Sequence, residues 1–330
     1  MSTATYARVR VNATSANIGP GFDVLGLCLD SPADVIEVTT DPGEVEVRGR
    51  VATSTIPRER RANCATVALA AALKGDPKRV EDSLRWGVRL TKGIPVAGGL
   101  GGSAASAVGG ALAGWALRGP EGGRLHACRQ RDAVANDQIL TAALVGEAVA
   151  AGAAHLDNVA PALLGGLVAV ASPRVPQGPP VVARLPIAPW WLATVTPLQQ
   201  VSTAHARVLL PKTVPLVDSV AATARSVLLT HALACGDSRL LSEVLEDPLA
   251  TPARSHLFPW LAVAQAAAVE AGAPALVISG SGPTVVALLQ TRAHARSVAR
   301  QTAAAIVSTG VDATSSIHRV GGGARIEAFE

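Results

Sequence analysis

The chain has few aromatic residues, although apolar residues are abundant. Aromatic residues make up 3% of the 330 residues, whereas apolar residues make up 49%. Alanine, valine and leucine must therefore fill the core, and such small side chains favour close packing of helices over clusters of bulky rings. The length suggests two domains, since a domain usually has about 150 residues.

Cysteines are also scarce, and no secretory signal is visible. The cysteines Cys28, Cys64, Cys128 and Cys235 are far apart and form no C-x-x-C pair. This spacing argues against a cysteine metal site and a disulfide framework, and it favours a reducing compartment. Residues 1–10 lack the apolar stretch of a signal peptide. We therefore expect a soluble, cytoplasmic protein.

The sequence has neither a strong charge excess nor a membrane span. Lysine and arginine number 29 against 25 acidic residues, and the basic residues are scattered. Residues 93–117 carry no charge, but they are rich in glycine and lack the leucine, isoleucine and phenylalanine content of a spanning helix. We expect neither nucleic acid nor a membrane as a partner. The small positive balance suits an acidic ligand such as a nucleotide.

The most informative stretch is a glycine loop. Gly98, Gly99, Gly101 and Gly102 lie within five positions, so the backbone can approach a ligand closely. The apolar spacing behind the loop predicts a helix over residues 103–117. A bare loop before a helix N-terminus offers free N–H groups and the positive end of the helix dipole, which together bind anions such as phosphate. The alternative is a segment of small residues that only packs helices.

The loop alone does not identify the nucleotide. It is not a P-loop, because the chain contains no Gly-Lys pair. It fits the dinucleotide pattern G-x-G-x-x-A through Gly99, Gly101 and Ala104, which is a weak signal without a buried strand directly before it. An NAD-linked oxidoreductase therefore stays open as an alternative.

Two further segments carry polar residues in unusual surroundings. Asn17 and Asp23 lie among glycines and a proline in residues 13–26, which suggests a loop shaped to hold two polar side chains. The alternative is an ordinary hairpin loop. Glu147 shares a helix face with Leu144 and Ala151, so its carboxylate needs a partner, and near a phosphate loop that partner would be Mg²⁺. The alternative is a glutamate at the edge of the polar face.

Periodicity predicts an α+β protein, in which strands and helices alternate. Residues 173–180 are rich in proline and glycine and mark the expected boundary between domains 1–172 and 173–330. The expected strands are 6–12, 35–38, 45–47, 82–91, 167–171 and 191–195. The expected helices are 63–73 with Asn63 as N-cap, 103–117, 131–151, 219–233 and 261–271.

Three segments resemble the GHMP kinase superfamily, and they occur in the order that is found in that superfamily. They are the Asn17/Asp23 loop, residues 95–105 and the glycine turn at 279–284. Within it, residues 13–23 and 155–161 are similar to those of homoserine kinases. The resemblance implies a ribosomal-S5-like N-terminal domain and a ferredoxin-like C-terminal domain with the active site between them. It implies phosphorylation of L-homoserine to O-phospho-L-homoserine by ATP with Mg²⁺, in threonine biosynthesis. Another GHMP small-molecule kinase is the alternative, and homodimers are common in the family.

The resemblance also implies roles by position. Ser103 and Glu147 would hold the metal, and Asn158 and Asp157 would lie at the reacting hydroxyl. The substrate set is Asn17, Asp23, His155, Asn158, Arg207 and Arg254. The nucleotide set is Asn63, Pro95, Val96, Ala97, Gly98, Gly99, Leu100, Gly101, Gly102, Ser103, Ala104 and Ala105.

Chemistry agrees with parts of this assignment. A bidentate arginine suits a carboxylate, and an aspartate suits an ammonium group. The loop departs from the family at Gly102, where a serine is usual, so a non-catalytic relative that only binds ligand is a further alternative. Homoserine kinases resemble one another in lacking an obvious base. Our hypothesis is that Asn158 orients the substrate hydroxyl and the proton leaves late, with Asp157 as the runner-up base.

Overall fold

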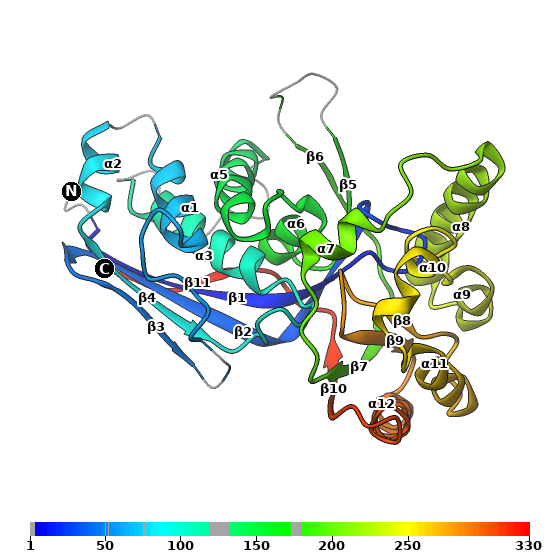
Figure 1. Ribbon diagram of the computed structural model, residues 1–330. Helices are drawn as coiled ribbons and strands as arrows, with labels where there is room; N and C mark the ends of the chain where they lie inside the picture. Colours follow the sequence, from blue (N-terminus) through cyan, green and yellow to red (C-terminus); the bar gives the residue numbers. More distant parts are fainter. Residues whose placement is uncertain are drawn as a thin grey trace.

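A computed structural model describes residues 4–49, 51, 53–74, 77–118, 133–172, 178 and 180–330. It contains a seven-stranded and a four-stranded sheet, each with helices packed against it (Figure 1). The predicted α+β class is confirmed. No helix in these ranges is long and apolar enough to cross a membrane. Of the cysteines, Cys28, Cys64 and Cys235 are free, and Cys128 lies outside the described residues.

The strands are β1 (Tyr6–Ala16), β2 (Leu25–Pro42), β3 (Val45–Gly49), β4 (Trp86–Lys92), β5 (Leu167–Ala171), β6 (Val181–Leu185), β7 (Trp191–Pro197), β8 (Val277–Ile278), β9 (Val285–Leu289), β10 (Ala313–Arg319) and β11 (Arg325–Phe329). The helices are α1 (Cys64–Ala72), α2 (Pro77–Ser83), α3 (Gly102–Ala116), α5 (Ala133–Ala151), α6 (Leu156–Leu164), α7 (Thr203–Val208), α8 (Leu216–Cys235), α9 (Ser238–Val244), α10 (Ala250–Arg254), the short 3₁₀ helix η2 (Ser255–Leu257), α11 (Leu261–Glu270) and α12 (Arg292–Val307).

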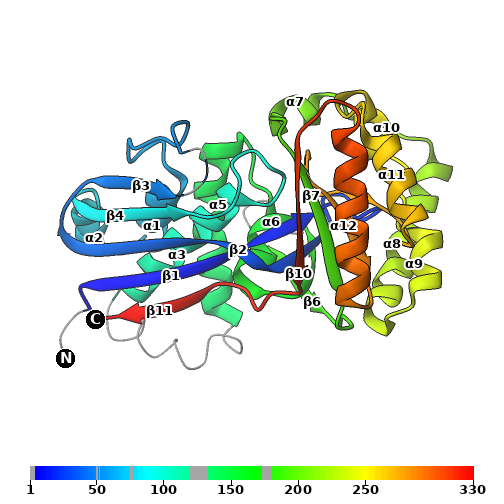
Figure 2. The same ribbon diagram turned by 90° about the horizontal axis from the view of Figure 1, so that it is seen from below.

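The large sheet has the order β11-β1-β2-β4-β3, and β5 and β6 extend it from β2. All its pairs are antiparallel except β3 with β4. The small sheet has the order β10-β7-β9-β8, and α12 packs along it (Figure 2). A dinucleotide-binding fold needs a mostly parallel sheet. The oxidoreductase alternative is therefore wrong.

Small residues let the helices behind the large sheet pack at backbone contact. Helices α1, α3 and α5 contact one another, and α3 lies against β1 and β2. A Cβ at Gly110 in α3 would lie 2.0 Å from the carbonyl oxygen of Ala65 in α1, and one at Gly114 would lie 2.7 Å from that of Leu69. Any larger side chain at Gly110 would push the two helices apart. The expectation of close helix packing is confirmed.

Several predicted boundaries were wrong, each for a local reason. Residues 13–16 belong to β1 and not to a loop, because this stretch of small and polar residues is buried on both faces. The strand expected over 82–91 begins only at Trp86, after α2 ends at Ser83. The strand expected over 35–38 is part of β2, which runs from Leu25 to Pro42 because its neighbours β1 and β4 continue to pair with it. Residues 131–132 of the predicted helix lie outside the described residues.

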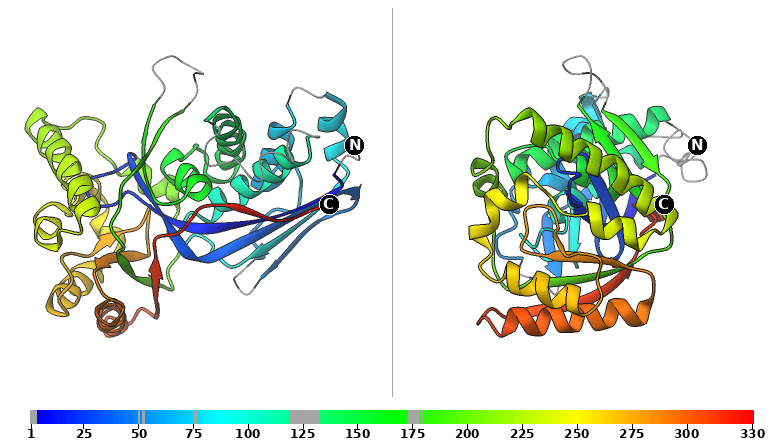
Figure 3. Two further views of the ribbon diagram at one scale, coloured as in Figure 1. Left: turned by 180° about the vertical axis from the view of Figure 1, so that it is seen from behind. Right: turned by 90° about the vertical axis from the view of Figure 1, so that its right-hand side faces the viewer.

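The two sheets do not divide the chain at residue 172. Both β6 and β11 follow that point, yet both belong to the large sheet, and Figure 3 shows β11, in red, running beside β1. Most of the expected boundary, residues 173–177 and 179, lies outside the described residues. The division into domains 1–172 and 173–330 stays a prediction.

Candidate active site

A cavity of about 630 Å³ opens at the glycine loop and is large enough for a small ligand. Helices α5, α6 and α7 and the turn at 279–284 also contribute to its wall. Most of the predicted site residues line it: Asn17, Asn63, residues 95–103, Glu147, His155, Asp157, Asn158, Arg207 and Arg254. The exceptions are Ala104 and Ala105, which are fully buried in α3, and Asp23, which reaches the site through a pair with Arg207.

The N-terminus of α3 points its free N–H groups at this cavity. Gly101 precedes the helix with φ at 66°, a left-handed conformation that favours glycine. The first bond within the helix runs from the N–H of Ala105 to Gly101 O at 2.9 Å. The three N–H groups between them come before that bond, so they can serve an anion. Ala104 can offer only its N–H, and the N–H of Ala105 is already used within the helix.

At Gly102, where the resemblance leads us to expect a serine, the structure has room for a Cβ. Such a Cβ would meet nothing closer than 3.5 Å, the distance to the side chain of Ile94. Crowding at the Cβ position therefore does not explain the absence of a side chain. The backbone N–H of Gly102 keeps its place in the first turn of α3.

The glycine loop is joined to the late glycine turn by close backbone contacts. Ser279 Oγ donates to Gly99 O at 2.7 Å, and the N–H of Thr284 donates to Gly98 O at 3.3 Å. A Cβ at Gly99 would lie 2.5 Å from Ser279 O, and φ there is 75°. The two glycine segments, which lie far apart in sequence, therefore meet at one wall of the cavity.

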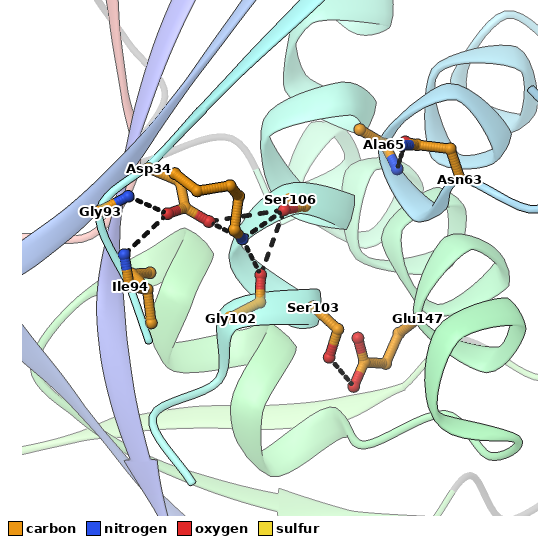
Figure 4. Close-up of polar contacts among 10 residues, drawn as sticks. Asp34, Asn63, Ala65, Gly93, Ile94, Gly102, Ser103, Ser106 and Glu147 are labelled. Atoms are coloured by element: carbon orange, nitrogen blue, oxygen red, sulfur yellow. Dashed lines mark hydrogen bonds and ion pairs between the residues drawn. The ribbon is translucent and has the colours of Figure 1, made fainter. Parts of the chain in front are cut away.

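A buried ion pair between Lys92 and Asp34 supports the loop (Figure 4). Lys92 Nζ also donates to Gly102 O and to Ser106 Oγ, both at 2.9 Å. Asp34 Oδ1 accepts from the N–H groups of Gly93 and Ile94 at 2.9 and 3.0 Å. One carboxylate thus holds the chain leaving β4, while its partner ammonium holds the first turn of α3.

Sequence reasoning missed this pair, although β4 carries a signal of it. Trp86, Val88, Leu90 and Lys92 alternate along the strand, and all are buried. A lysine at the fourth position of an otherwise apolar face is rarely buried without a partner. That alternation could have indicated a buried acidic partner, but it could not have identified Asp34.

Glu147 and Ser103, the predicted metal ligands, lie together. Ser103 Oγ donates to Glu147 Oε1 at 3.1 Å (Figure 4). His155 Nδ1 lies 3.4 Å from the same oxygen. Glu147 is 3% exposed, which excludes a place on a solvated helix face. Its Oε2 and His155 Nε2 are buried without a hydrogen-bond partner among the described residues. An orphaned carboxylate oxygen beside a phosphate-binding helix end fits a divalent cation, since Mg²⁺ often takes one or two carboxylates plus phosphate.

Asn17 organises the early loop. Its Oδ1 accepts from the N–H of Asp23 at 2.8 Å, and its Nδ2 donates to Gly280 O at 3.1 Å. Asn17 and Asp23 have φ values of 58° and 55°, which are rare for residues other than glycine. Asn17 thus ties the loop to the late glycine turn. Of the predicted polar loop over 13–26, residues 17–24 form a loop, Asn17 and Phe22 line the cavity, and a role toward a ligand stays a prediction.

Arg207 and Arg254 meet at one end of the cavity with Asp23 and Phe22. Arg207 donates to both oxygens of Asp23, at 2.9 and 2.7 Å. The guanidinium carbons of Arg207 and Arg254 lie 5.9 and 5.2 Å from the centre of the Phe22 ring, within the range of cation–π attraction. Burial lowers the pKa of Arg254, which nonetheless stays charged at neutral pH. Sequence reasoning missed Phe22, one of very few aromatic residues in the chain.

The remaining predicted residues, Asn158, Asp157 and Asn63, also line the cavity. Asn158 and Asp157 lie in the first turn of α6. Burial raises the pKa of Asp157 to about 6, the nearby Asp23 adds to the shift, and His155 and Arg207 oppose it.

Asn63 caps α1 as predicted, since its Oδ1 accepts from the N–H of Ala65 at 3.0 Å. Its Nδ2 donates to Pro57 O at 2.7 Å, so its role toward a nucleotide stays a prediction.

Comparison with known families agrees with this geometry. Residues 62–166 match the family described as GHMP kinases N terminal domain, and residues 229–307 match GHMP kinases C terminal. Fold and cavity together define a GHMP-type small-molecule kinase. Such a kinase takes ATP as its phosphoryl donor and acts on a hydroxyl group.

Individual relatives narrow the family. The chain is 38% identical to a homoserine kinase of Thermococcus kodakarensis, over 96% of this chain and 99% of that one. It is 37% identical to a homoserine kinase of Halobacterium salinarum, over 96% and 95%. The crystal structure of a homoserine kinase from Cytophaga hutchinsonii superposes with a TM-score of 0.82 at 28% identity, covering 99% of this chain and 98% of that one. The chain belongs to the homoserine kinase family.

Proposed function

We propose that this protein transfers the γ-phosphoryl group of ATP to the side-chain hydroxyl of L-homoserine, as a step of threonine biosynthesis. The products are O-phospho-L-homoserine, ADP and the hydroxyl proton. One observation carries the proposal. A helix N-terminus suited to phosphate and two arginines suited to a carboxylate line the same cavity, and one of these arginines, Arg207, pairs with Asp23, which suits an ammonium group.

The nucleotide end of the cavity is the glycine loop. The free N–H groups at the start of α3 suit the ATP phosphates, because they lie at the positive end of the helix dipole. Ile56, Pro57 and Val149 give part of the wall an apolar surface that suits a purine ring. Asn63 lies beside Pro57 on this wall.

Glu147 and Ser103 would hold Mg²⁺ at this end. When bound, the ion neutralises charge on the transferring phosphoryl oxygens. Phosphoryl transfer depends mostly on positioning and charge neutralisation, so the fixed N–H groups of α3 contribute in the same way.

We expect Glu147→Gln to raise the Mg²⁺ concentration for half-maximal activity. The amide keeps the shape of the side chain but removes the charge that attracts the ion, and an increase of about 10- to 100-fold is typical when a group that supports a metal is lost. Titration of activity with Mg²⁺ measures it, and high Mg²⁺ should restore part of the rate. Glu270→Gln, at an exposed position in α11, is the control. An unchanged Mg²⁺ curve for Glu147→Gln would remove Glu147 from the metal site.

The amino-acid end matches the charges of homoserine. The substrate carboxylate suits Arg207 and Arg254, and its ammonium suits Asp23. Asp23 and Arg207 now satisfy each other at 2.9 and 2.7 Å. A zwitterion placed between them would exchange that one pair for two pairs of opposite charge, so the cluster stays balanced when substrate binds.

The reacting hydroxyl would lie at Asn158, which orients it, and its proton leaves late in the transfer. Asp157, with its pKa of about 6, is the competing base. Because the transition state of phosphoryl transfer is loose, a strong base contributes little to bond formation.

Asp157→Asn distinguishes these two mechanisms. We expect kcat to fall far less than the roughly 10²- to 10⁴-fold that follows removal of a general base. We also expect the pH profile of kcat to keep its wild-type shape. If Asp157 were the base, the wild-type rate would fall as the pH drops through about 6 and the carboxylate gains a proton. In that case Asp157→Asn would lose most of its kcat, and its pH profile would no longer show the fall near pH 6.

Coupled release of ADP tests the function directly. Homoserine, mevalonate and shikimate are offered in turn with ATP and Mg²⁺, and we expect release with homoserine far above that with the other two. Mass spectrometry of the product should show O-phospho-L-homoserine. Equal or greater release with mevalonate or shikimate would refute the proposed substrate, and the absence of release with all three would refute the proposed reaction.

We further propose that a second copy of the chain covers the exposed apolar face of α8. Val217, Val220 and Val227 recur at helical spacing there and are 71%, 60% and 62% exposed. Val220→Glu should therefore reduce the mass measured by light scattering from two chains to one. Gln301→Glu, at an exposed position in α12, adds the same charge away from α8 and should leave the mass unchanged. A single-chain mass for the unaltered protein would contradict the proposal.

A further inference from the structure

Thr14 is a fully buried polar residue near the end of β1, at the point where two catalytic elements meet. The register between β1 and β2 shifts just before it, from Asn12 opposite Ala33 to Thr14 opposite Cys28. Irregularities of this kind commonly re-aim a side chain beside an active site. Here the hydroxyl of Thr14 is turned toward α6 and the glycine loop, as its contacts establish.

Thr14 contacts the substrate side and the phosphate side at once. Its Oγ1 donates to Asn158 Oδ1 at 2.8 Å, and its N–H donates to Leu100 O at 3.1 Å. A Cβ at Gly101 would lie only 2.0 Å from Thr14 Oγ1 and 2.9 Å from Asn158 Oδ1. The glycine loop therefore passes directly over the Thr14–Asn158 hydrogen bond at Gly101, the residue just before α3.

In the structure, this hydrogen bond engages the oxygen end of the Asn158 amide. The amide has an acceptor oxygen and a donor nitrogen. Thr14 engages the oxygen, and the described residues offer no hydrogen-bond partner to Nδ2. Asn158 lines the cavity. The nitrogen, a donor, is the group left to face the substrate.

We infer that Thr14 is a positioning residue that presents Asn158 Nδ2 to the acceptor hydroxyl and fixes its distance from the phosphate loop. The inference rests on the proposed function. A hydroxyl oxygen that accepts from Nδ2 uses one lone pair and keeps its proton. Its other lone pair forms the new bond to the γ-phosphorus while the bond from phosphorus to the ADP oxygen breaks. The proton is then released to solvent.

Two substitutions at Thr14 test this role. Thr14→Val keeps the shape but removes the hydroxyl, and we expect kcat to fall about 10- to 100-fold, the cost of a small misplacement at a reacting centre. The KM for ATP should change little, because the backbone bond to Leu100 remains. Thr14→Ser keeps the hydroxyl and should retain most of kcat. Equal losses in the two variants, or a loss confined to the KM for ATP, would overturn the inference.

A double-mutant cycle separates positioning from mere packing. If Thr14 acts through Asn158, then Thr14→Val should have little further effect on kcat in an Asn158→Ala background. Independent, multiplicative effects would show that Thr14 acts elsewhere. Thermal unfolding of each variant checks that folding is intact.

Asn158→Asp provides a test that does not depend on the folding of the valine variant. The carboxylate still accepts from Thr14 but offers no donor to the substrate, so kcat should fall by at least as much as in Thr14→Val. Wild-type kcat in Asn158→Asp would overturn the inference. Failure of the proposed function itself looks different, because the unaltered protein would then release no ADP with homoserine.

Discussion

Replacing Lys92 by methionine should cost about 3–5 kcal/mol of the free energy of unfolding, the usual effect of breaking a buried ion pair. Methionine fills a similar volume but leaves the Asp34 carboxylate buried, charged and without its ammonium partner. Lys92 is 4% exposed and Asp34 is 1% exposed, so water cannot take the place of the lost partner. Denaturant unfolding of the two proteins measures the difference.

Two further variants show whether the pairing itself is responsible. Arg89 lies three residues earlier in β4 and pairs at the surface with Glu46 at 3.1 Å, with its side chain 43% exposed. Arg89→Met should therefore cost no more than about 1 kcal/mol. In the double variant Asp34→Asn, Lys92→Met no charge is left unpaired, so the loss should be smaller than in Lys92→Met alone. A loss for Lys92→Met as small as that for Arg89→Met would contradict a stabilising role for the pair.

The part of the site that the sequence could predict is the part built from backbone. A run of glycines before an apolar helix indicates, from local sequence alone, where the helix begins and where a ligand can approach the backbone closely. The structure accordingly has α3 beginning at Gly102, one residue from the expected start. The Asn63 cap was equally local, since its side chain bonds to N–H groups two and three residues away.

Contacts between distant segments could not be predicted in this way. Thr14 and Asn158 are 144 positions apart, and Asp34 and Lys92 are 58 apart. In neither pair does the local sequence around one residue identify the other, because the sheet order that brings them together depends on tertiary packing. The salt bridge between Arg207 and Asp23 could not be predicted either. The resemblance led us to expect a substrate carboxylate as the partner of Arg207, and no local pattern indicated Asp23.

The sequence patterns were least informative where a strand changes its surroundings. β1 alternates as a half-buried strand over its first residues and is then buried on both faces up to Ala16. A period of two vanishes when both faces are covered, so residues 13–16 resembled a loop. The true loop over 17–24 is short, and Asn17 braces it against the late glycine turn.

Gly99→Ala should lower kcat/KM by about 100-fold or more, because its methyl group has no room. The new Cβ would lie 2.5 Å from Ser279 O and 2.7 Å from Gly282 O, both backbone atoms that cannot rotate away. The φ of 75° adds strain of about 1–3 kcal/mol for a residue with a side chain. The glycine loop and the late turn must therefore separate, which moves the phosphate-binding N–H groups relative to the amino-acid pocket. Steady-state kinetics with both substrates measures the loss.

Gly102→Ala is the matched control, since it adds the same methyl group to the same loop. Its Cβ would meet nothing closer than 3.5 Å, and the N–H that faces the cavity stays in place, so the loss should be at least tenfold smaller than for Gly99→Ala. Equal losses would mean that the loop tolerates no side chain anywhere, and the contact with the late turn would then not be the cause. A large loss for Gly99→Ala alone would establish that the phosphate cradle works only while the late glycine turn holds it, which couples the small sheet to catalysis.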